Sequence, residues 1–221
     1  AFTITVTETS SSSTDTMTVT ITITGADDSV DAGSDGTGAV TEDASTTTAT
    51  GSVSASDVDG DDSSFTYAIG TAAGTYGDLA MSGAAWTYTL DNSESATNAL
   101  DAGDSVTDAF TITVTETSSS STDTMTVTIT ITGADDASVW AGTSTGSLTE
   151  DASTTTASGA LTISDVDDDT PTITDVSSTA GANGYGNFVM ASGTWTYTLD
   201  NSAAATDALD AGDSVTDTYT F

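Results

Sequence analysis

A stretch of 28 residues occurs twice in this chain without a single difference. It reads AFTITVTETSSSSTDTMTVTITITGADD and occupies residues 1–28 and 109–136. The rest of the sequence also repeats, although not residue for residue. The corresponding pairs are VTEDASTTTATGSVSASDVDG (40–60) with LTEDASTTTASGALTISDVDD (148–168), and WTYTLDNSESATNALDAGDSVTDAF (86–110) with WTYTLDNSAAATDALDAGDSVTDTY (195–219). The chain is therefore a tandem array, and each period of about 110 residues is long enough to enclose a core of its own.

The period divides the chain into three parts. We expect residues 1–28 to be the closing hairpin and linker of a preceding repeat, residues 29–136 a complete β-sandwich repeat, and residues 137–221 a second repeat without its final hairpin. A lone hairpin and an open sandwich are both expected to fold poorly alone. Two organisations fit this division. The chain is a window of a longer array, or separate copies join head to tail, each donating its first hairpin to its neighbour by strand complementation.

Apolar residues alternate with threonine in both copies of the repeated stretch. Phe2, Ile4 and Val6 share one face of an extended chain, and residues 16–24 continue the pattern. Such patterns, rich in β-branched residues, predict half-buried strands, here joined as a hairpin by a polar loop. Further strands are expected at residues 40–43, 48–55, 65–69, 79–81, 86–90 and 106–114. The chain is thus predicted to be all-β, with tandem antiparallel sandwiches of the immunoglobulin type.

Trp86 and Trp195 occupy equivalent positions in these predicted strands. We expect both to be core residues, because each alternates with other apolar residues of its strand. A carbohydrate-stacking platform is the alternative role for these tryptophans, but no other pattern in the sequence supports it.

The chain carries 34 acidic residues and no lysine, arginine or histidine, which gives a formal net charge of −34 at pH 7. No salt bridge between side chains can form, so the carboxylates are neutralised only from outside the chain. Calcium is the expected counterion, because it prefers hard oxygen ligands. The same charge argues against nucleic acid as a partner, since its backbone is bound by lysine and arginine. It also argues against direct binding to anionic membranes.

Acidic residues gather at four places in each repeat, next to predicted turns. The densest is the loop Asp57-Val58-Asp59-Gly60-Asp61, where several carboxylates within one tight turn suit calcium. The loop lacks the closing glutamate and the flanking helices of an EF-hand. Solvated turn residues are the alternative interpretation, because aspartate favours turns for its own hydrogen bonds. The candidate metal ligands are Asp27, Asp28, Glu42, Asp43, Asp57, Asp59, Asp61, Asp91, Asp135, Asp136, Glu150, Asp151, Asp165, Asp167, Asp169 and Asp200.

The order of short motifs along the chain resembles the VCBS repeat. That family comprises cadherin-like or bacterial immunoglobulin-like domains found in tandem in very large secreted bacterial adhesins. The motifs are VTED, TTATGSV, DVDGDD, GTYGDL, WTYTLDN, GDSVTD, FTITVTET and TVTITITGADD. The linker departs from the family's pattern, because Asp27 and Asp135 stand where asparagine is usual and no proline follows.

The resemblance to cadherins implies calcium ligands at matching positions. Glu42 and Glu150 correspond to the first-strand glutamate, and Asp91 and Asp200 to the acidic residue of the Leu-Asp motif. The Asp-x-Asp loop is matched by Asp57 with Asp59 and by Asp165 with Asp167, and the interdomain linker by Asp27, Asp28, Asp135 and Asp136. Asp43 and Asp151 are additional candidates, and Thr170-Pro171 alters the loop after Asp169 in the second repeat.

Two functions of different classes follow. The first is a calcium-stiffened extracellular structural repeat that forms the stalk or filament of a bacterial surface adhesin, with neighbouring copies of the repeat as partners. The second is a binding module for a glycan, ice or another cell surface, for which the threonine rows at 16–24 and 124–132 offer a flat array of hydroxyls. The β-propensity of threonine on an exposed strand face explains the same rows. No enzymatic activity is expected, because without His, Lys, Arg and Cys most nucleophiles and bases are missing.

Overall fold

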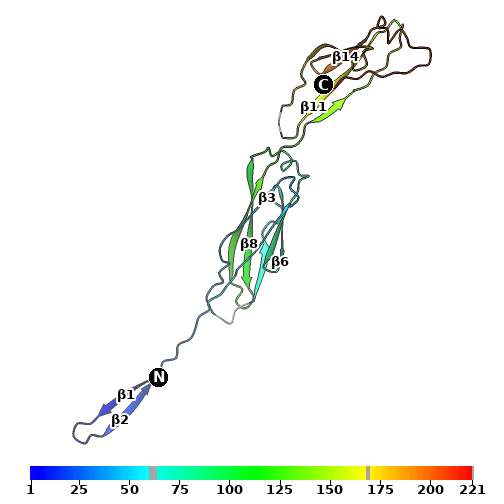
Figure 1. Cartoon of the computed structure of the whole chain (residues 1–221). Coiled ribbons are helices and arrows are strands. Elements are labelled where there is room, and N and C mark those ends of the chain that lie inside the picture. Colours follow the sequence, from blue (N-terminus) through cyan, green and yellow to red (C-terminus); the bar gives the residue numbers. More distant parts are fainter. Residues whose placement is uncertain (60–63, 168–169, 221) are drawn as a thin grey trace.

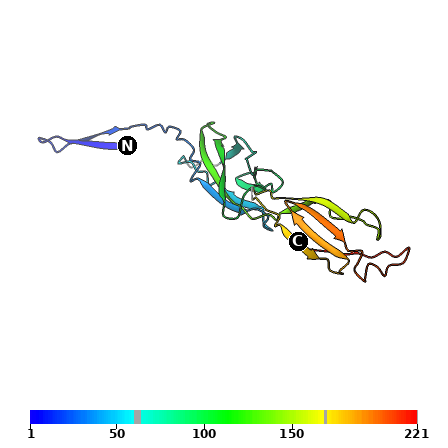
Figure 2. The ribbon, with the colours of Figure 1, turned by 90° about the horizontal axis from the view of Figure 1, so that it is seen from above.

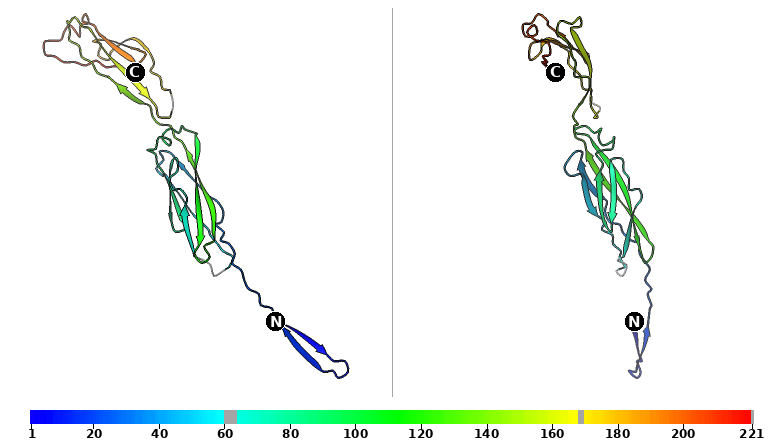
Figure 3. Two further views of the ribbon diagram at one scale, coloured as in Figure 1. Left: turned by 180° about the vertical axis from the view of Figure 1, so that it is seen from behind. Right: turned by 90° about the vertical axis from the view of Figure 1, so that its right-hand side faces the viewer.

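The computed structural model describes residues 1–59, 64–167 and 170–220, and it is built from β-strands. Three bodies follow one another: a hairpin, a sandwich of two sheets and a single sheet (Figure 1). The same succession is seen from above and from behind (Figures 2 and 3). The prediction of an all-β, immunoglobulin-like fold is confirmed. In these residues no helix has the length and the hydropathy needed to cross a membrane.

The middle body is a sandwich with the strand arrangement expected of an immunoglobulin-like repeat. One sheet has the order β3-β9-β8-β5, with strands Gly36–Thr41, Thr122–Thr132, Ser105–Glu116 and Phe65–Ile69. The other has the order β4-β7-β6, with strands Thr48–Ser52, Ala85–Leu90 and Gly77–Ser82. β3 pairs with β9 in parallel, and the other pairs are antiparallel.

The core lies between the two sheets and is formed by alternate residues of each strand. In β8, Phe110 and Ile112 are 2% and 0% exposed, while the threonines between the apolar residues face outward or lie half-buried. From the opposite sheet, Trp86 and Tyr88 of β7 are 2% and 0% exposed. Trp86 is therefore a core residue, and so is Trp195 in the following repeat, which is 5% exposed.

The last body, from residue 137 onward, consists of one sheet with the order β10-β11-β14-β13-β12. Its strands are Val139–Gly142, Thr156–Ser164, Thr194–Leu199, Gly186–Ala191 and Val176–Ala180. β11, β14 and β13 correspond in sequence to β4, β7 and β6 of the sandwich. Within the described part of this body, residues 143–155 and 200–220 form no strand, so no second sheet covers the first.

The hairpin at the other end consists of β1 (Phe2–Thr7) and β2 (Thr14–Val19). β2 is shorter than the strand that the alternation at residues 16–24 predicts. The identical sequence at residues 124–132 stays in strand conformation in β9. The difference arises because the last residues of β9 pair with β3 and with the beginning of β8, whereas β2 has no such neighbours.

Candidate metal centre between the repeats

Acidic side chains from both repeats meet where the sandwich joins the following sheet. Glu42 and Asp43 follow the end of β3, and Asp101 lies in the loop before β8. The linker after β9 carries Asp135 and Asp136. The loop after β11 contributes Asp165 and Asp167 from the second repeat.

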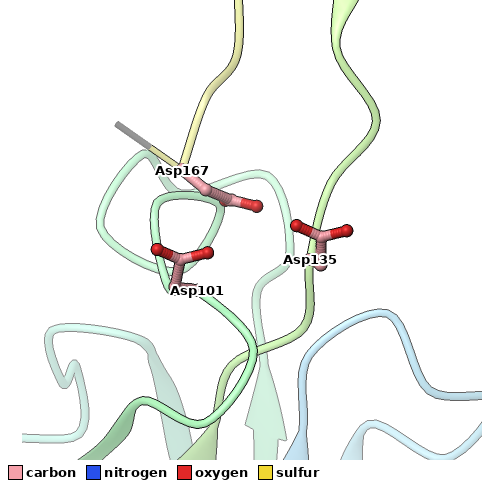
Figure 4. A group of neighbouring side chains, drawn as sticks. All are labelled: Asp101, Asp135 and Asp167. Atoms are coloured by element: carbon pink, nitrogen blue, oxygen red, sulfur yellow. The ribbon is translucent and has the colours of Figure 1, made fainter. Parts of the chain in front are cut away.

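Three of these carboxylates form a compact group. One oxygen from each of Asp101, Asp135 and Asp167 lies within 4.8 Å of the other two. Figure 4 shows that the three side chains come from a loop of the sandwich, from the linker and from a loop of the next repeat, and that they point toward one another. Asp167 is 4% exposed and Asp135 is exposed. Like charges this close repel one another unless a cation neutralises them.

A second group adjoins the first and shares Asp167 with it. Its members are Glu42, Asp43, Asp136 and Asp167. Glu42 is 2% exposed, and its Oε2 atom accepts a hydrogen bond from the Ala134 amide at 3.3 Å. Burial raises the pKa of Glu42, and the charges of Asp136 and Asp43 raise it further. The pKa of Asp136 is raised by desolvation first and then by the charges of Asp167 and Asp43. No side chain supplies positive charge to this group, because the chain has no lysine, arginine or histidine.

Hydrogen bonds hold the loop of the second repeat against the linker. The Asp136 amide donates to Oδ2 of Asp167 at 2.6 Å, and the Asp167 amide donates to Oδ1 of Asp165 at 3.2 Å. The hydroxyl of Ser138 donates to Oδ2 of Asp165 at 2.9 Å. These bonds fix the carboxylates of the Asp-x-Asp loop beside those of the linker.

Several buried oxygen atoms at this joint have no hydrogen-bond partner among the described residues. They are Oε1 of Glu42, Oδ1 of Asn92, Oδ2 of Asp136 and Oδ1 of Asp167. Buried polar atoms are normally satisfied, because an unsatisfied one costs about 1–3 kcal/mol. Carboxylate and amide oxygens are the ligands that calcium prefers, and it takes about six to eight of them. The donor set therefore fits a hard divalent cation.

The joint before the sandwich, between residues 27–28 and the loop at Asp57, contains two of the same hydrogen bonds. The Asp28 amide donates to Oδ2 of Asp59 at 2.6 Å, and the Asp59 amide donates to Oδ1 of Asp57 at 2.9 Å. These contacts match those of Asp136, Asp167 and Asp165 at the next joint. The described residues of the Asp-x-Asp loop thus make the same two hydrogen bonds in both repeats.

The remaining candidates lie away from the joint between the repeats. Glu150 and Asp151 occupy the positions of Glu42 and Asp43 in the last repeat, and Oε2 of Glu150 is also buried without a partner. Asp27 belongs to the preceding linker. Asp61 and Asp169 lie outside the described residues.

Asp91 and Asp200 have a local role in the structure. Oδ1 of Asp91 accepts hydrogen bonds from the amide and the hydroxyl of Ser93, at 2.9 and 2.6 Å. Asp200 makes the same two bonds to Ser202. These bonds lower the pKa of both carboxyl groups, as expected for an aspartate that begins a helical turn.

The sequence interpretation missed two residues of the joint. Asn92 donates from Nδ2 to Oδ1 of Asp43 at 3.1 Å, next to the second group. Asp101 belongs to the compact group. Both recur in the second repeat, as Asn201 and Asp210, but their repetition could not be distinguished from that of ordinary turn residues.

Comparison with known proteins supports the fold assignment. A family model described as the bacterial cadherin-like domain matches residues 26–133. This part of the chain is thus similar to a cadherin-like repeat of the immunoglobulin type, while the narrower VCBS assignment remains a prediction. No curated protein is significantly similar to the chain in sequence.

Two solved structures align with most of this chain. An endo-fucoidan hydrolase of glycoside hydrolase family 107 aligns with 90% of this chain at 16% identity and a TM-score of 0.35, and the chain spans 29% of that protein. The titin domains z1z2 in complex with telethonin align with 79% of this chain at 9% identity and a TM-score of 0.32, over 83% of their own length. At these TM-scores neither alignment bears on the fold or the function of this chain.

Proposed function

We propose that this chain is a calcium-stiffened structural repeat of a bacterial extracellular surface protein, which acts as part of a stalk or filament. The observation that carries the proposal is the acidic joint, where seven carboxylates from both repeats gather and buried oxygens lack partners. The similarity to bacterial cadherin-like domains, which are typical of surface and adhesin-type proteins, supports the same function.

The acidic residues of the joint come from the sandwich, the linker and the next repeat. Glu42 and Asp101 belong to the sandwich, Asp135 and Asp136 to the linker, and Asp167 to the next repeat. A bound divalent cation would supply the positive charge that no side chain of this chain offers. Oxygen atoms of the sandwich, the linker and the next repeat would then all bind the same cation instead of repelling one another. Bending at the linker would pull these oxygen atoms away from the cation, so the bound cation would stiffen the linker.

Calcium binding by a matched pair of variants tests this proposal. Glu42→Gln removes one buried carboxylate charge from the joint, while Glu94→Gln makes the same change at an exposed position. Titration calorimetry with calcium should show at least a ~10-fold weaker site for Glu42→Gln, in line with the loss of a charged ligand. Glu94→Gln should bind as the unchanged chain does. Equal affinities for all three proteins would contradict the proposed centre.

A further inference from the structure

β3 lies at the edge of its sheet and pairs in parallel with β9. The ladder joins six residue pairs, from Gly36 with Val127 to Thr41 with Thr132. It continues beyond β3, since the Glu42 amide donates to the Thr132 carbonyl at 2.9 Å. The strand that begins the sandwich is therefore held in its sheet by the strand that ends it.

Side chains extend the same pairing toward the linker that precedes the sandwich. Three amides donate to side chains of the facing segment: Thr126 to Oδ1 of Asp35 at 2.8 Å, Ala32 to Oδ2 of Asp123 at 2.9 Å, and Val30 to Oγ of Ser121 at 3.1 Å. Each bond joins residues 91 positions apart, as every pair of the ladder does. Residues 30–42 and 121–132 thus form one continuous contact in a single parallel register, which we call the clamp.

The clamp runs between the two ends of the sandwich at which the chain enters and leaves. Val30 lies beside the turn that joins β8 to β9, and Glu42 lies beside the last residue of β9. Figure 1 shows the preceding linker reaching one end of the sandwich and the next linker leaving from the other. Because the two strands are parallel, tension between these linkers pulls β3 and β9 in opposite directions along their length. All bonds of the clamp are then loaded at once, in shear.

Separation of β3 from β9 would also open the core. Val40 of β3 is 6% exposed. A Cβ atom added at Gly38 would lie 2.8 Å from Cδ1 of Ile129 and 3.4 Å from Cη2 of Trp86, so the backbone of β3 lies closely over core side chains of both sheets. Removal of the strand would bring this apolar surface into contact with water, which costs free energy. The clamp and the core are therefore expected to break together.

We propose that the sandwich bears tension along the array, and that the clamp of β3 and β9 is the element that resists it. Bonds loaded in shear must break together, whereas bonds pulled apart from one end break one after another. The same hydrogen bonds therefore resist far more force in the first geometry. This function goes beyond stiffening of the joint, because the clamp lies within one repeat and needs no cation.

A cation at the acidic joint would reinforce the clamp, and this part rests on the proposed function. Glu42 follows β3 directly, and its Oε2 atom accepts a hydrogen bond from the Ala134 amide at 3.3 Å. Asp135 and Asp136 follow β9 in the linker. An ion bound by carboxylates of both segments would connect the ends of the two strands and add to their resistance in shear.

Single-molecule stretching of the full chain, with force handles at two alternative pairs of positions, tests the clamp. The chain has no cysteine, so introduced cysteines at exposed positions determine where the force acts. Ser29→Cys with Ala137→Cys loads the clamp in shear, while Thr41→Cys with Ala137→Cys pulls the same strands apart from one end. At equal force in a chelator, the sandwich should unfold at least ~100-fold more slowly with the first pair. Equal unfolding rates with the two pairs would overturn the clamp.

A side-chain variant in the shear geometry provides a second criterion. Asp35→Ala removes the bond to the Thr126 amide from the clamp. Thr117→Ala removes a bond of similar length outside the clamp, from its hydroxyl to the Ser64 carbonyl at 2.9 Å. Asp35→Ala should raise the unfolding rate under force ~10-fold, and Thr117→Ala should leave it unchanged. Equal rates in the two variants would contradict the clamp.

Calcium separates the clamp from the acidic joint. It should slow unfolding of the pair Ser29→Cys with Ala137→Cys at least ~10-fold further than in the chelator. An unchanged rate would contradict the reinforcing ion alone, since the clamp is measured without calcium. Calcium binding that depends on Glu42, together with equal rates in the two pulling geometries, would overturn the clamp and leave the joint in place.

Discussion

At the scale of single residues, Asp108 is a buried carboxylate that connects three segments of the sandwich by hydrogen bonds. Asp108 is 4% exposed and accepts hydrogen bonds from the Thr75 amide, the Tyr76 amide and the Tyr88 hydroxyl, at 2.8, 3.0 and 2.9 Å. Asp217 makes the corresponding bond to Tyr197 in the last repeat. In the sandwich, the glycine-rich turn before β6 is thereby attached to β8, on the other sheet. In the last repeat, Asp217 accepts the corresponding bonds from the turn before β13, although residue 217 lies in no strand.

We expect Tyr88→Phe to lower the free energy of unfolding of the sandwich by about 1.5–3 kcal/mol, because it removes one hydrogen bond to a buried charge. Urea unfolding measures this loss. Tyr67→Phe is the matched control, since its hydroxyl makes no hydrogen bond described in the structure, and it should change stability by less than about 0.5 kcal/mol. Equal losses in the two variants would mean that the Asp108 bond contributes nothing.

The same variant has a pH signature. Burial raises the pKa of Tyr88 above its ordinary value of 10.0, and the hydrogen bond to Asp108 raises it further. Stability from this phenol is complete below pH 10.0, where the unfolded chain also keeps the proton, and declines as the pH rises above it. The unchanged chain should therefore lose more stability above pH 10.0 than Tyr88→Phe does, and parallel curves would contradict the shift.

At the scale of elements, the packing of β4 against β7 depends on a glycine. A Cβ atom added at Gly51 would lie 2.3 Å from Cζ2 of Trp86. Gly159 has the same position against Trp195, where an added Cβ atom would lie 2.6 Å from Nε1. The tryptophan of each repeat therefore lies flat across the neighbouring strand only because that strand carries no side chain there.

Gly51→Ala should therefore displace Trp86 and lower the free energy of unfolding by about 1–3 kcal/mol, the usual cost of overpacking a core. Tryptophan fluorescence during urea unfolding reports both effects. Gly25→Ala is the control, because an added Cβ atom meets nothing within 4 Å there and the change should be nearly neutral. A variant as stable as the unchanged chain would show that β4 moves away from Trp86 without cost.

At the scale of the whole molecule, the sandwich and the last sheet follow one another in Figure 1, so the acidic joint between them determines how the two are oriented. The sandwich and the last sheet are connected by the linker after β9 and by the acidic contacts around Asp167. Without a cation those contacts include several like charges, so electrostatic repulsion favours separation of the repeats. The charge of −34 extends the same repulsion over the whole chain at low salt.

Removal of calcium should consequently change the dimensions of the chain without unfolding the sandwich. Small-angle scattering of the chain should show a broader distribution of distances in a chelator than in calcium. Far-ultraviolet circular dichroism should stay the same, because the described hydrophobic core of the sandwich is formed without acidic side chains. Identical scattering in both conditions would contradict stiffening by the cation.

Much of the fold could be predicted from the sequence, because alternation of apolar residues and threonine is a local property. β5, β7 and the hairpin β8–β9 lie where the pattern puts strands. The prediction of the first strand of the sandwich was less accurate, since β3 spans Gly36–Thr41 and not residues 40–43. Its Gly36 and Gly38 carry no apolar signal, and the strand exists because β9 pairs with it in parallel.

The sequence by itself determined the period of the array, the all-β class and the excess of carboxylates without a counterion, because each of these depends only on residue types and their spacing. The tertiary structure decided which carboxylates meet. Asp101 and Asn92 join Asp135, Asp136 and Asp167 because three loops and a linker converge at one end of the sandwich. It also decided that the second copy of the repeated stretch, as β8 and β9, lies in the middle of a sheet between β3 and β5, because strand pairing depends on segments far away in the sequence.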